Sequence, residues 1–335
     1  MAYVLRSSPD LAHSATATPL SRFHTCPPLH FVCARGSLEP LIVFLKAAEK
    51  DSRLIDLNAE CEDGMTPLHY AAAKGHVLAV RILTGAKNVE VDRRDRDTGK
   101  TPLQFAAWHG HEDVVAHLIS LREKVDVNTL DDDENTPLHN ACIHGNGRTV
   151  HRLLSCPEVD ANALATDGKR PLHLAALEHR WDAIRALLQC DRVDVNARDH
   201  MGATTLFYVL YASAYARYAD LARLVVHRLD VDVNVRCGVT EETALHLAVE
   251  TKASLEAVLW RADADVHARN ATGKTPMHRA AMKCRVEDLQ VVLEVLEARG
   301  ANAEDRDDDG KTVLDLLDER LRQTTADGAE RRARK

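Results

Sequence analysis

A short motif, Thr-Pro-Leu-His or a close variant, recurs along almost the whole chain, and its spacing restricts the possible folds more than any other feature. Thr-Pro-Leu-His-Tyr-Ala-Ala at residues 66–72 returns as Thr-Pro-Leu-Gln-Phe-Ala-Ala at 101–107 and as Thr-Pro-Leu-His-Asn-Ala-Cys at 136–142. The proline or its equivalent stands at positions 28, 67, 102, 137, 171, 205, 244, 276 and 313. Steps of 32 to 39 residues are typical of a stacked-repeat protein, in which each unit buries its apolar side against its neighbours.

Each copy predicts a pair of short helices followed by a turn. Thr before Pro indicates a helix start, because the hydroxyl can cap free backbone N–H groups and Pro fits the first helical turn. The Ala-Ala pair keeps this helix slim, and Gly75, Gly110 and Gly145, eight residues after the Pro, predict its end. A second amphipathic helix follows, as at 114–119, and a Val-Asp-Val-Asn element, as at 125–128, leads into a polar turn.

The unit resembles the ankyrin repeat, whose signature contains Thr-Pro-Leu-His-x-Ala-Ala and whose period is about 33 residues. The resemblance extends from Pro27 to Arg320, in about nine copies. It implies an all-α repeat solenoid of helix–turn–helix units, each with a hairpin loop that projects to one side. We therefore expect a repeat domain over residues 25–320, a disordered segment at 1–24, and a polar and basic tail at 321–335.

The copies in the second half of the chain depart from the motif. The copy at 204–242 has neither Pro nor His in the motif and contains about four extra residues, about one helical turn, so we expect an irregular insert. The Gly that ends the first helix is replaced by His179, Ser213, Lys252 and Cys284. Because a side chain in the left-handed region costs roughly 1 kcal/mol, we expect this half to be less regular and less stable. The last copy predicts one apolar helix at 313–317 and a frayed end from 324.

Charge and hydropathy exclude several classes of protein. Asp and Glu number 51 against 43 Lys and Arg, and the net charge of −8 argues against direct nucleic-acid binding, which normally needs a basic surface. No apolar run reaches the roughly 18 residues of a membrane-spanning helix, so we expect no membrane contact. The eight cysteines form no Cys-x-x-Cys pair, which predicts reduced thiols in an intracellular, cytoplasmic protein.

The chain contains none of the common catalytic or cofactor-binding motifs, so we expect neither enzymatic activity nor a cofactor. The recurring histidine of the motif is expected to hydrogen-bond the loops, as the resemblance implies, and its copies lie too far apart to share a metal ion. His24, Cys26, His30 and Cys33 form one dense cluster of zinc-binding residue types. Because the repeat itself accounts for His30 and Cys33, we expect no metal site, and zinc binding is the alternative.

The resemblance places partner contacts on the loop tips and on the concave face of the first helices, where the two residues after the Ala-Ala pair point. The first of these positions carries a large apolar residue in four consecutive copies, although the repeat leaves it free. With their neighbours and one acidic loop, the predicted partner-binding residues are Trp108, His109, Ile143, His144, Leu177, Glu178, Tyr211, Asp131 and Asp132. The alternative is that the apolar side chains pack on a neighbouring loop and the acids are solvated turn residues.

Two further patterns stay open between structure and function. Tyr208, Tyr211, Tyr215 and Tyr218 follow a helical spacing, which fits core filling around the insert as well as a docking site. Asn162 and Asn196, in the Val-Asp-Val-Asn element and its variant, are interpreted as turn residues, and the resemblance implies hydroxylation of these side chains as the alternative.

Together these features predict a non-enzymatic scaffold or adaptor that binds a protein partner and is itself a monomer. One alternative is a regulatory protein that docks on a transcription factor or a biosynthetic protein, with the basic residues at 331–335 as a nuclear import signal. Another alternative is an enzyme with a site in the irregular sixth repeat, around Tyr211 and His227.

Overall fold

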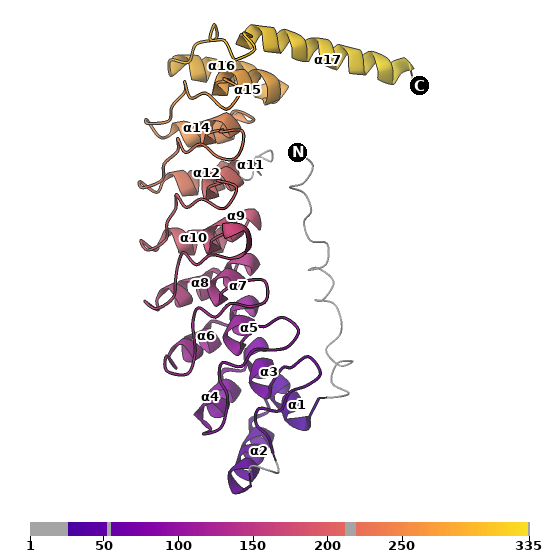
Figure 1. Cartoon of the computed structure of the whole chain (residues 1–335), viewed down its shortest axis with the longest axis vertical. Coiled ribbons are helices and arrows are strands. Elements are labelled where there is room, and N and C mark those ends of the chain that lie inside the picture. Colours follow the sequence, from indigo (N-terminus) through magenta and orange to yellow (C-terminus); the bar gives the residue numbers. More distant parts are fainter. Residues whose placement is uncertain (1–25, 52–54, 212–218, 334–335) are drawn as a thin grey trace. The chain divides into compact units, whose positions relative to one another are not determined.

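The computed structural model describes residues 26–51, 55–211 and 219–333, and within these ranges the regular elements are helices joined by turns (Figure 1). One isolated antiparallel bridge, between Cys237 and Glu242, accompanies them. The predicted all-α repeat fold is therefore confirmed, while the number of about nine copies stays a prediction. The segment at 1–24, for which disorder was predicted, lies outside the described residues.

The chain divides into two compact units, Met1–Asp132 and Asp133–Lys335. The described helices of the first unit are α1 (Pro28–Arg35), α2 (Leu38–Lys50), α3 (Pro67–Ala73), α4 (Val77–Gly85), α5 (Pro102–His109) and α6 (Glu112–Ile119). The inner helices α1, α3 and α5 pack side by side, and the outer helices α2, α4 and α6 form a second row beside them (Figure 1). Each inner helix also packs against the outer helix that follows it in the chain.

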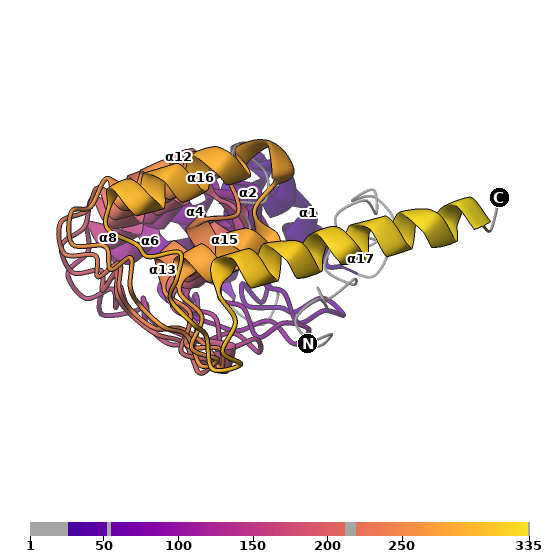
Figure 2. The same ribbon diagram turned by 90° about the horizontal axis from the view of Figure 1, so that it is seen from above.

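The second unit repeats the same arrangement. Its inner helices are α7 (Pro137–His144), α9 (Pro171–Leu177), α11 (Thr205–Tyr211), α13 (Ala244–Ala248), α15 (Pro276–Lys283) and α17 (Val313–Ala333). Its outer helices are α8 (Gly147–Leu154), α10 (Trp181–Leu188), α12 (Ala219–Val226), α14 (Lys252–Leu259) and α16 (Val286–Ala298), and a 3-10 turn, η2, covers Thr166–Gly168. Figure 2 shows the hairpin loops of this unit on the side of the inner helices, away from α12 and α16.

The Thr-Pro pairs begin the inner helices as the sequence predicts. The side-chain oxygens of Thr101 and Thr136 each accept a hydrogen bond at 3.4 Å from the backbone N–H three residues further on. The next Pro occupies the first helical position, where its missing N–H leaves no donor unpaired. Gly110 and Gly145 follow the same two helices with φ of 77°, so the predicted left-handed ends are confirmed.

The core of each unit is a strip between its inner and outer helices. The Ala-Ala pairs of α3 and α5 are inaccessible to solvent, and so is the Ala-Cys pair of α7. Leucines from the inner and outer helices, such as Leu68, Leu83 and Leu118, fill the space between them. Such an arrangement leaves the opposite side of the inner helices available for other contacts.

The later copies end their first helices in different ways. His179 adopts the left-handed backbone, with φ of 54°. Cys284 instead has φ of −60° and ψ of 148°, and Lys252 is the first residue of α14, because α13 is only five residues long. The predicted backbone strain is therefore wrong for Cys284 and Lys252 and right for His179, whereas Ser213 lies outside the described residues.

The end of the chain also differs from the expectation. Instead of a short helix and a frayed end from 324, α17 continues from Val313 to Ala333 and extends past α15 (Figure 2). The segment after Leu321 consists largely of Arg, Gln, Ala and Glu, which are strong helix formers, and it contains no Pro. The helix propensity of these residues therefore explains why α17 continues beyond its apolar part.

Candidate partner-binding surface

Trp108 lies near the end of α5, and its ring contacts Lys100, which precedes that helix. Its half-buried ring lies 5.0 Å from the ammonium group of Lys100, a cation–π distance. The same ammonium group lies 3.2 Å from a carboxylate oxygen of Asp131, and the two side chains are only 6% and 0% exposed. The prediction that Asp131 contacts a partner is therefore wrong, because its carboxylate is buried as the counter-ion of Lys100.

The neighbouring acid, Asp132, does lie on the surface of the first unit. Its carboxylate accepts a hydrogen bond of 2.7 Å from the Arg94 guanidinium, and both side chains are about half exposed. This exposed ion pair reduces the negative charge that the loop tip presents. Asp132 is thus exposed as one half of a charge pair, and its contact with a partner stays a prediction.

His109 is exposed at the last position of α5. Its Nδ1–H donates to the Phe105 carbonyl at 2.9 Å, and its ring stacks on His111, with centroids 6.0 Å apart and planes 8° from parallel. His111 is itself fixed, since its Nε2–H donates to the Ala73 carbonyl at 3.0 Å. The two rings are thus held in a fixed arrangement, and His109 directly follows Trp108 in the sequence.

In the second unit, the predicted apolar residues differ in exposure. Leu177 is 36% exposed and Tyr211 is 61% exposed, each at the end of an inner helix. Ile143 and His144 are half-buried, and Glu178 is exposed. Leu177 and Tyr211 therefore present apolar surface that the packing of the repeats does not cover, and Ile143 presents less.

The tyrosine pattern divides between the core and the surface. The Tyr208 hydroxyl donates to a carboxylate oxygen of Asp199, and burial raises the pKa of this phenol, so it serves the internal structure. The Tyr211 ring instead stacks on Phe207, with centroids 6.2 Å apart and planes 14° from parallel. Tyr215 and Tyr218 lie outside the described residues.

Two exposed apolar side chains in turns of the second unit were not predicted from the sequence. Met201 and Val239 lie in the turns that precede α11 and α13, and they are 58% and 93% exposed. Met282, on α15, occupies the same motif position as Leu177 and Tyr211 and is 40% exposed. Met201 and Val239 could have been identified from the sequence, because they are apolar residues in turns that elsewhere carry Asp and Gly.

The recurring histidines serve the fold. The Nδ1 atom of His69 accepts from the Thr66 N–H at 3.0 Å, and its Nε2–H donates to the Lys100 carbonyl at 3.2 Å. His173 and His246 reach the Ala197 and Lys274 carbonyls in the same way, each at 2.9 Å. The expectation that these histidines hydrogen-bond the loops is confirmed, and burial lowers the pKa of His69 to about 4.

The asparagines of the Val-Asp-Val-Asn element do more than form turns. The amide of Asn162 donates to the Arg192 carbonyl at 2.7 Å and accepts from the Asp194 N–H at 2.8 Å. Asn196 makes the same two bonds to Asp230 and Asp232. Each side chain thus joins one repeat to the next by hydrogen bonds, a role that the sequence did not predict.

The cluster of zinc-binding residue types does not assemble within the described chain. His30 donates from Nε2 to the Met65 carbonyl at 3.1 Å, and Cys33 is buried on the same helix, α1. His24 lies outside the described residues. Among the residues that are described, no group of three or more His, Cys, Asp or Glu side chains is placed to hold a metal ion.

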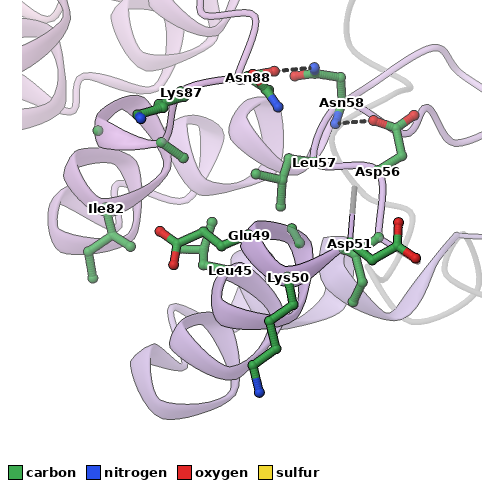
Figure 3. A pocket seen from close by; sticks show the side chains of 14 residues that line it. Leu45, Glu49, Lys50, Asp51, Asp56, Leu57, Asn58, Ile82, Lys87 and Asn88 are labelled. Atoms are coloured by element: carbon green, nitrogen blue, oxygen red, sulfur yellow. Dashed lines mark hydrogen bonds between the residues drawn. The ribbon is translucent and has the colours of Figure 1, made fainter. Parts of the chain in front are cut away.

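A cavity of about 920 Å³ lies between α2 and α4 in the first unit (Figure 3). Leu45, Leu57 and Ile82 form its apolar part, and charged side chains, among them Glu49 and Lys87, lie around them. This cavity was not predicted from the sequence.

The structure therefore defines a class of protein: a repeat protein of paired helices whose inner helices carry exposed apolar side chains. Comparison with known proteins agrees. A family model of ankyrin repeats, in three copies, matches residues 29–131 and again 118–199, together just over half of the chain. The chain belongs to the ankyrin repeat family.

Two curated relatives are similar over a short stretch. The human protein named "Ankyrin repeat domain-containing protein SOWAHD" is 36% identical over 67 residues, which are 20% of this chain and 21% of that protein. Its mouse counterpart is also 36% identical over 67 residues, 20% of each chain. The match spans about a fifth of these relatives, so it supports the repeat and not a shared whole-protein role.

Ankyrin repeats are in general modules for protein–protein interaction, and the family is typically non-enzymatic. In the described part of the chain, none of the helices combines the length and apolar character needed to cross a membrane.

Proposed function

We propose that this protein is a scaffold or adaptor that binds a partner protein through its inner helices and hairpin loop tips. The observation that carries the proposal is the exposure of Leu177 and Tyr211 at one repeat position on neighbouring inner helices, α9 and α11. Folding does not require large apolar side chains there, since the equivalent position in α3 is Ala73. Burying apolar surface in an interface contributes roughly 25 cal/mol per Å².

The surroundings of these side chains favour a protein partner over a small ligand. Glu178 and the half-buried His144 add polar groups beside the apolar residues, as at the rim of an interface. Phe207 supports the Tyr211 ring by stacking, which lowers the entropy that the ring loses on binding. The half-buried Trp108 offers a similar pre-ordered ring in the first unit, since the Lys100 ammonium lies 5.0 Å from it.

The enzyme alternative receives no support from the two residues on which it rests. His227 lies against the Trp260 ring, with centroids 4.4 Å apart, whereas Tyr211 stacks on Phe207. The regulatory alternative belongs to the same physical class, and the identity and compartment of the partner decide between it and an adaptor role.

Site-specific photocrosslinking tests the proposal. A benzophenone amino acid replaces Leu177 or Tyr211 in the full-length chain, and a matched control carries it at Val286, which is 79% exposed on the outer helix α16. We expect a crosslinked partner protein from the two inner positions and none from Val286. The same adduct at all three positions, or no adduct at Leu177 and Tyr211, would contradict the proposal.

A further inference from the structure

Two cysteine thiols of the first unit contact the same tyrosine hydroxyl. Cys26 lies two residues before α1, Cys61 lies in the hairpin that precedes α3, and Tyr70 is on α3. The sulfur atoms of Cys26 and Cys61 are each 3.6 Å from the Tyr70 hydroxyl oxygen. The two sulfurs are therefore at most twice that distance apart, although 35 positions separate them in the sequence.

The two thiols differ in access to solvent. Cys61 and Tyr70 are buried, while Cys26 is half-buried. Burial raises the pKa of Cys26, the Tyr70 hydroxyl lowers it, and the neighbouring Cys61 thiol raises it again. Cys26 is thus held mainly as a thiol at neutral pH, and it is the one of the two that a dissolved oxidant reaches.

The remaining cysteines lack this combination. Cys33, Cys142 and Cys284 are inaccessible to solvent, and burial raises the pKa of Cys33 to about 12 and that of Cys284 to about 11. Cys156 and Cys237 are also buried. Cys190 is the second half-buried cysteine, and it provides an internal control.

We propose that Cys26 and Cys61 are a redox site, at which a hydroperoxide oxidises the two thiols to an intrachain disulfide. The Cys26 thiolate attacks one peroxide oxygen, the O–O bond breaks, and the products are a sulfenic acid and, after proton uptake, water. The Cys61 sulfur then attacks the Cys26 sulfur, and the sulfenic hydroxyl leaves with the Cys61 proton as a second water. Two thiols and one hydrogen peroxide thus give one disulfide and two waters, and a dithiol reductant reverses the oxidation by exchange.

The disulfide closes a loop that contains α1 and α2. Leu41 is the one fully buried residue of α2, and Val43 is 66% exposed, so few contacts hold this helix. A crosslink around a loop of this length lowers the unfolding equilibrium constant by roughly several hundredfold. Oxidation therefore fastens the first repeat to the hairpin of the second. Formation requires the two sulfurs to turn from the Tyr70 hydroxyl toward each other.

The test uses the full-length protein treated with hydrogen peroxide, followed by intact-mass measurement and peptide mapping without reduction. We expect the loss of two hydrogens, a peptide that links Cys26 to Cys61, and slower amide exchange by at least tenfold in α1 and α2. Dithiothreitol should restore the starting mass and exchange rates.

Three matched variants separate the outcomes. Cys26→Ser and Cys61→Ser should each abolish the linked peptide, and Cys190→Ser should leave it unchanged. A sulfinic acid on Cys26 without a link, a link to another cysteine, or a loss of two hydrogens that persists in Cys61→Ser would overturn the proposal. Cys26 precedes the first helix, so its serine variant is expected to fold, and circular dichroism verifies this.

Discussion

Lys100 and Asp131 show how one buried pair changes the interpretation of an acidic loop. From the sequence, Asp131 and Asp132 are indistinguishable members of a polar turn. In the structure, the carboxylate of Asp131 is inaccessible and pairs with Lys100, whereas Asp132 is exposed and pairs with Arg94. Which of two adjacent acids turns inward depends on a lysine about thirty residues away, and sequence patterns do not carry that information.

The buried pair leads to a prediction for stability. Lys100→Met leaves the Asp131 carboxylate buried without its counter-ion, and we expect a loss of about 3–5 kcal/mol in the free energy of unfolding, measured in urea. The matched control is Lys169→Met, because Lys169 pairs with the largely exposed Asp167. Its loss should be under about 1 kcal/mol. Equal losses in the two variants would show that the Lys100 pair is not buried as described.

The buried histidines lead to a prediction for pH. Burial lowers the pKa of His69 to about 4, and it also lowers the pKa values of His30, His173 and His246. An unfolded histidine binds its proton below about pH 6.5, so between pH 6.5 and 4 the unfolded state holds more protons. Stability should therefore be complete above pH 6.5 and fall as the pH decreases, by up to about 1.4 kcal/mol per pH unit for each histidine.

His69→Gln provides the control for this pH dependence. Gln104 occupies the same position in the next copy, where its side chain accepts a hydrogen bond from the Thr101 N–H and donates one to the Thr129 carbonyl. The variant should keep most of its stability at pH 7 and show a shallower fall toward pH 4 in urea titrations. An unchanged slope would contradict the assignment of the pH dependence to His69.

At the scale of single helices, the sequence predicts starts better than ends. Thr-Pro pairs mark the starts because a cap and a fixed φ act locally. The ends vary with the packing of the next segment: α13 stops after five residues, Cys284 leaves its helix in an extended conformation, and α17 continues to Ala333. The presence or absence of Gly after the first helix of a repeat therefore does not predict which of these endings the helix adopts.

His179 leads to a prediction for one helix end. It has φ of 54°, where a side chain costs roughly 1–2 kcal/mol and Gly costs little. His179→Gly should therefore raise the free energy of unfolding by about 0.5–1 kcal/mol after the entropy loss of Gly is counted. Cys284→Gly is the control, and it should destabilise, because Cys284 is buried with φ of −60°. A destabilised His179→Gly would show that contacts of the ring outweigh the backbone strain.

For the whole molecule, the repeat could be predicted from the motif and its spacing, and the family from the resemblance of that motif to the ankyrin signature. The division into Met1–Asp132 and Asp133–Lys335 could not, because the motif spacing of 35 residues from Pro102 to Pro137 is the same as in the preceding step. The single domain at 25–320 and the tail at 321–335 stay predictions. Of the predicted surface, Leu177, Tyr211, His109, Glu178 and Asp132 are exposed, while Asp131 is not.

Quantitative affinity purification of the full-length chain tests whether the inner helices bind a partner protein. Leu177→Ser with Tyr211→Ser removes exposed apolar surface at little cost in stability. Leu78→Ser with Val286→Ser does the same on the outer helices α4 and α16. We predict one set of proteins recovered equally by the wild type and the outer variant, and at least tenfold less by the inner variant. Equal recovery by all three chains, or by the inner variant and the wild type alone, would contradict partner binding by the inner helices.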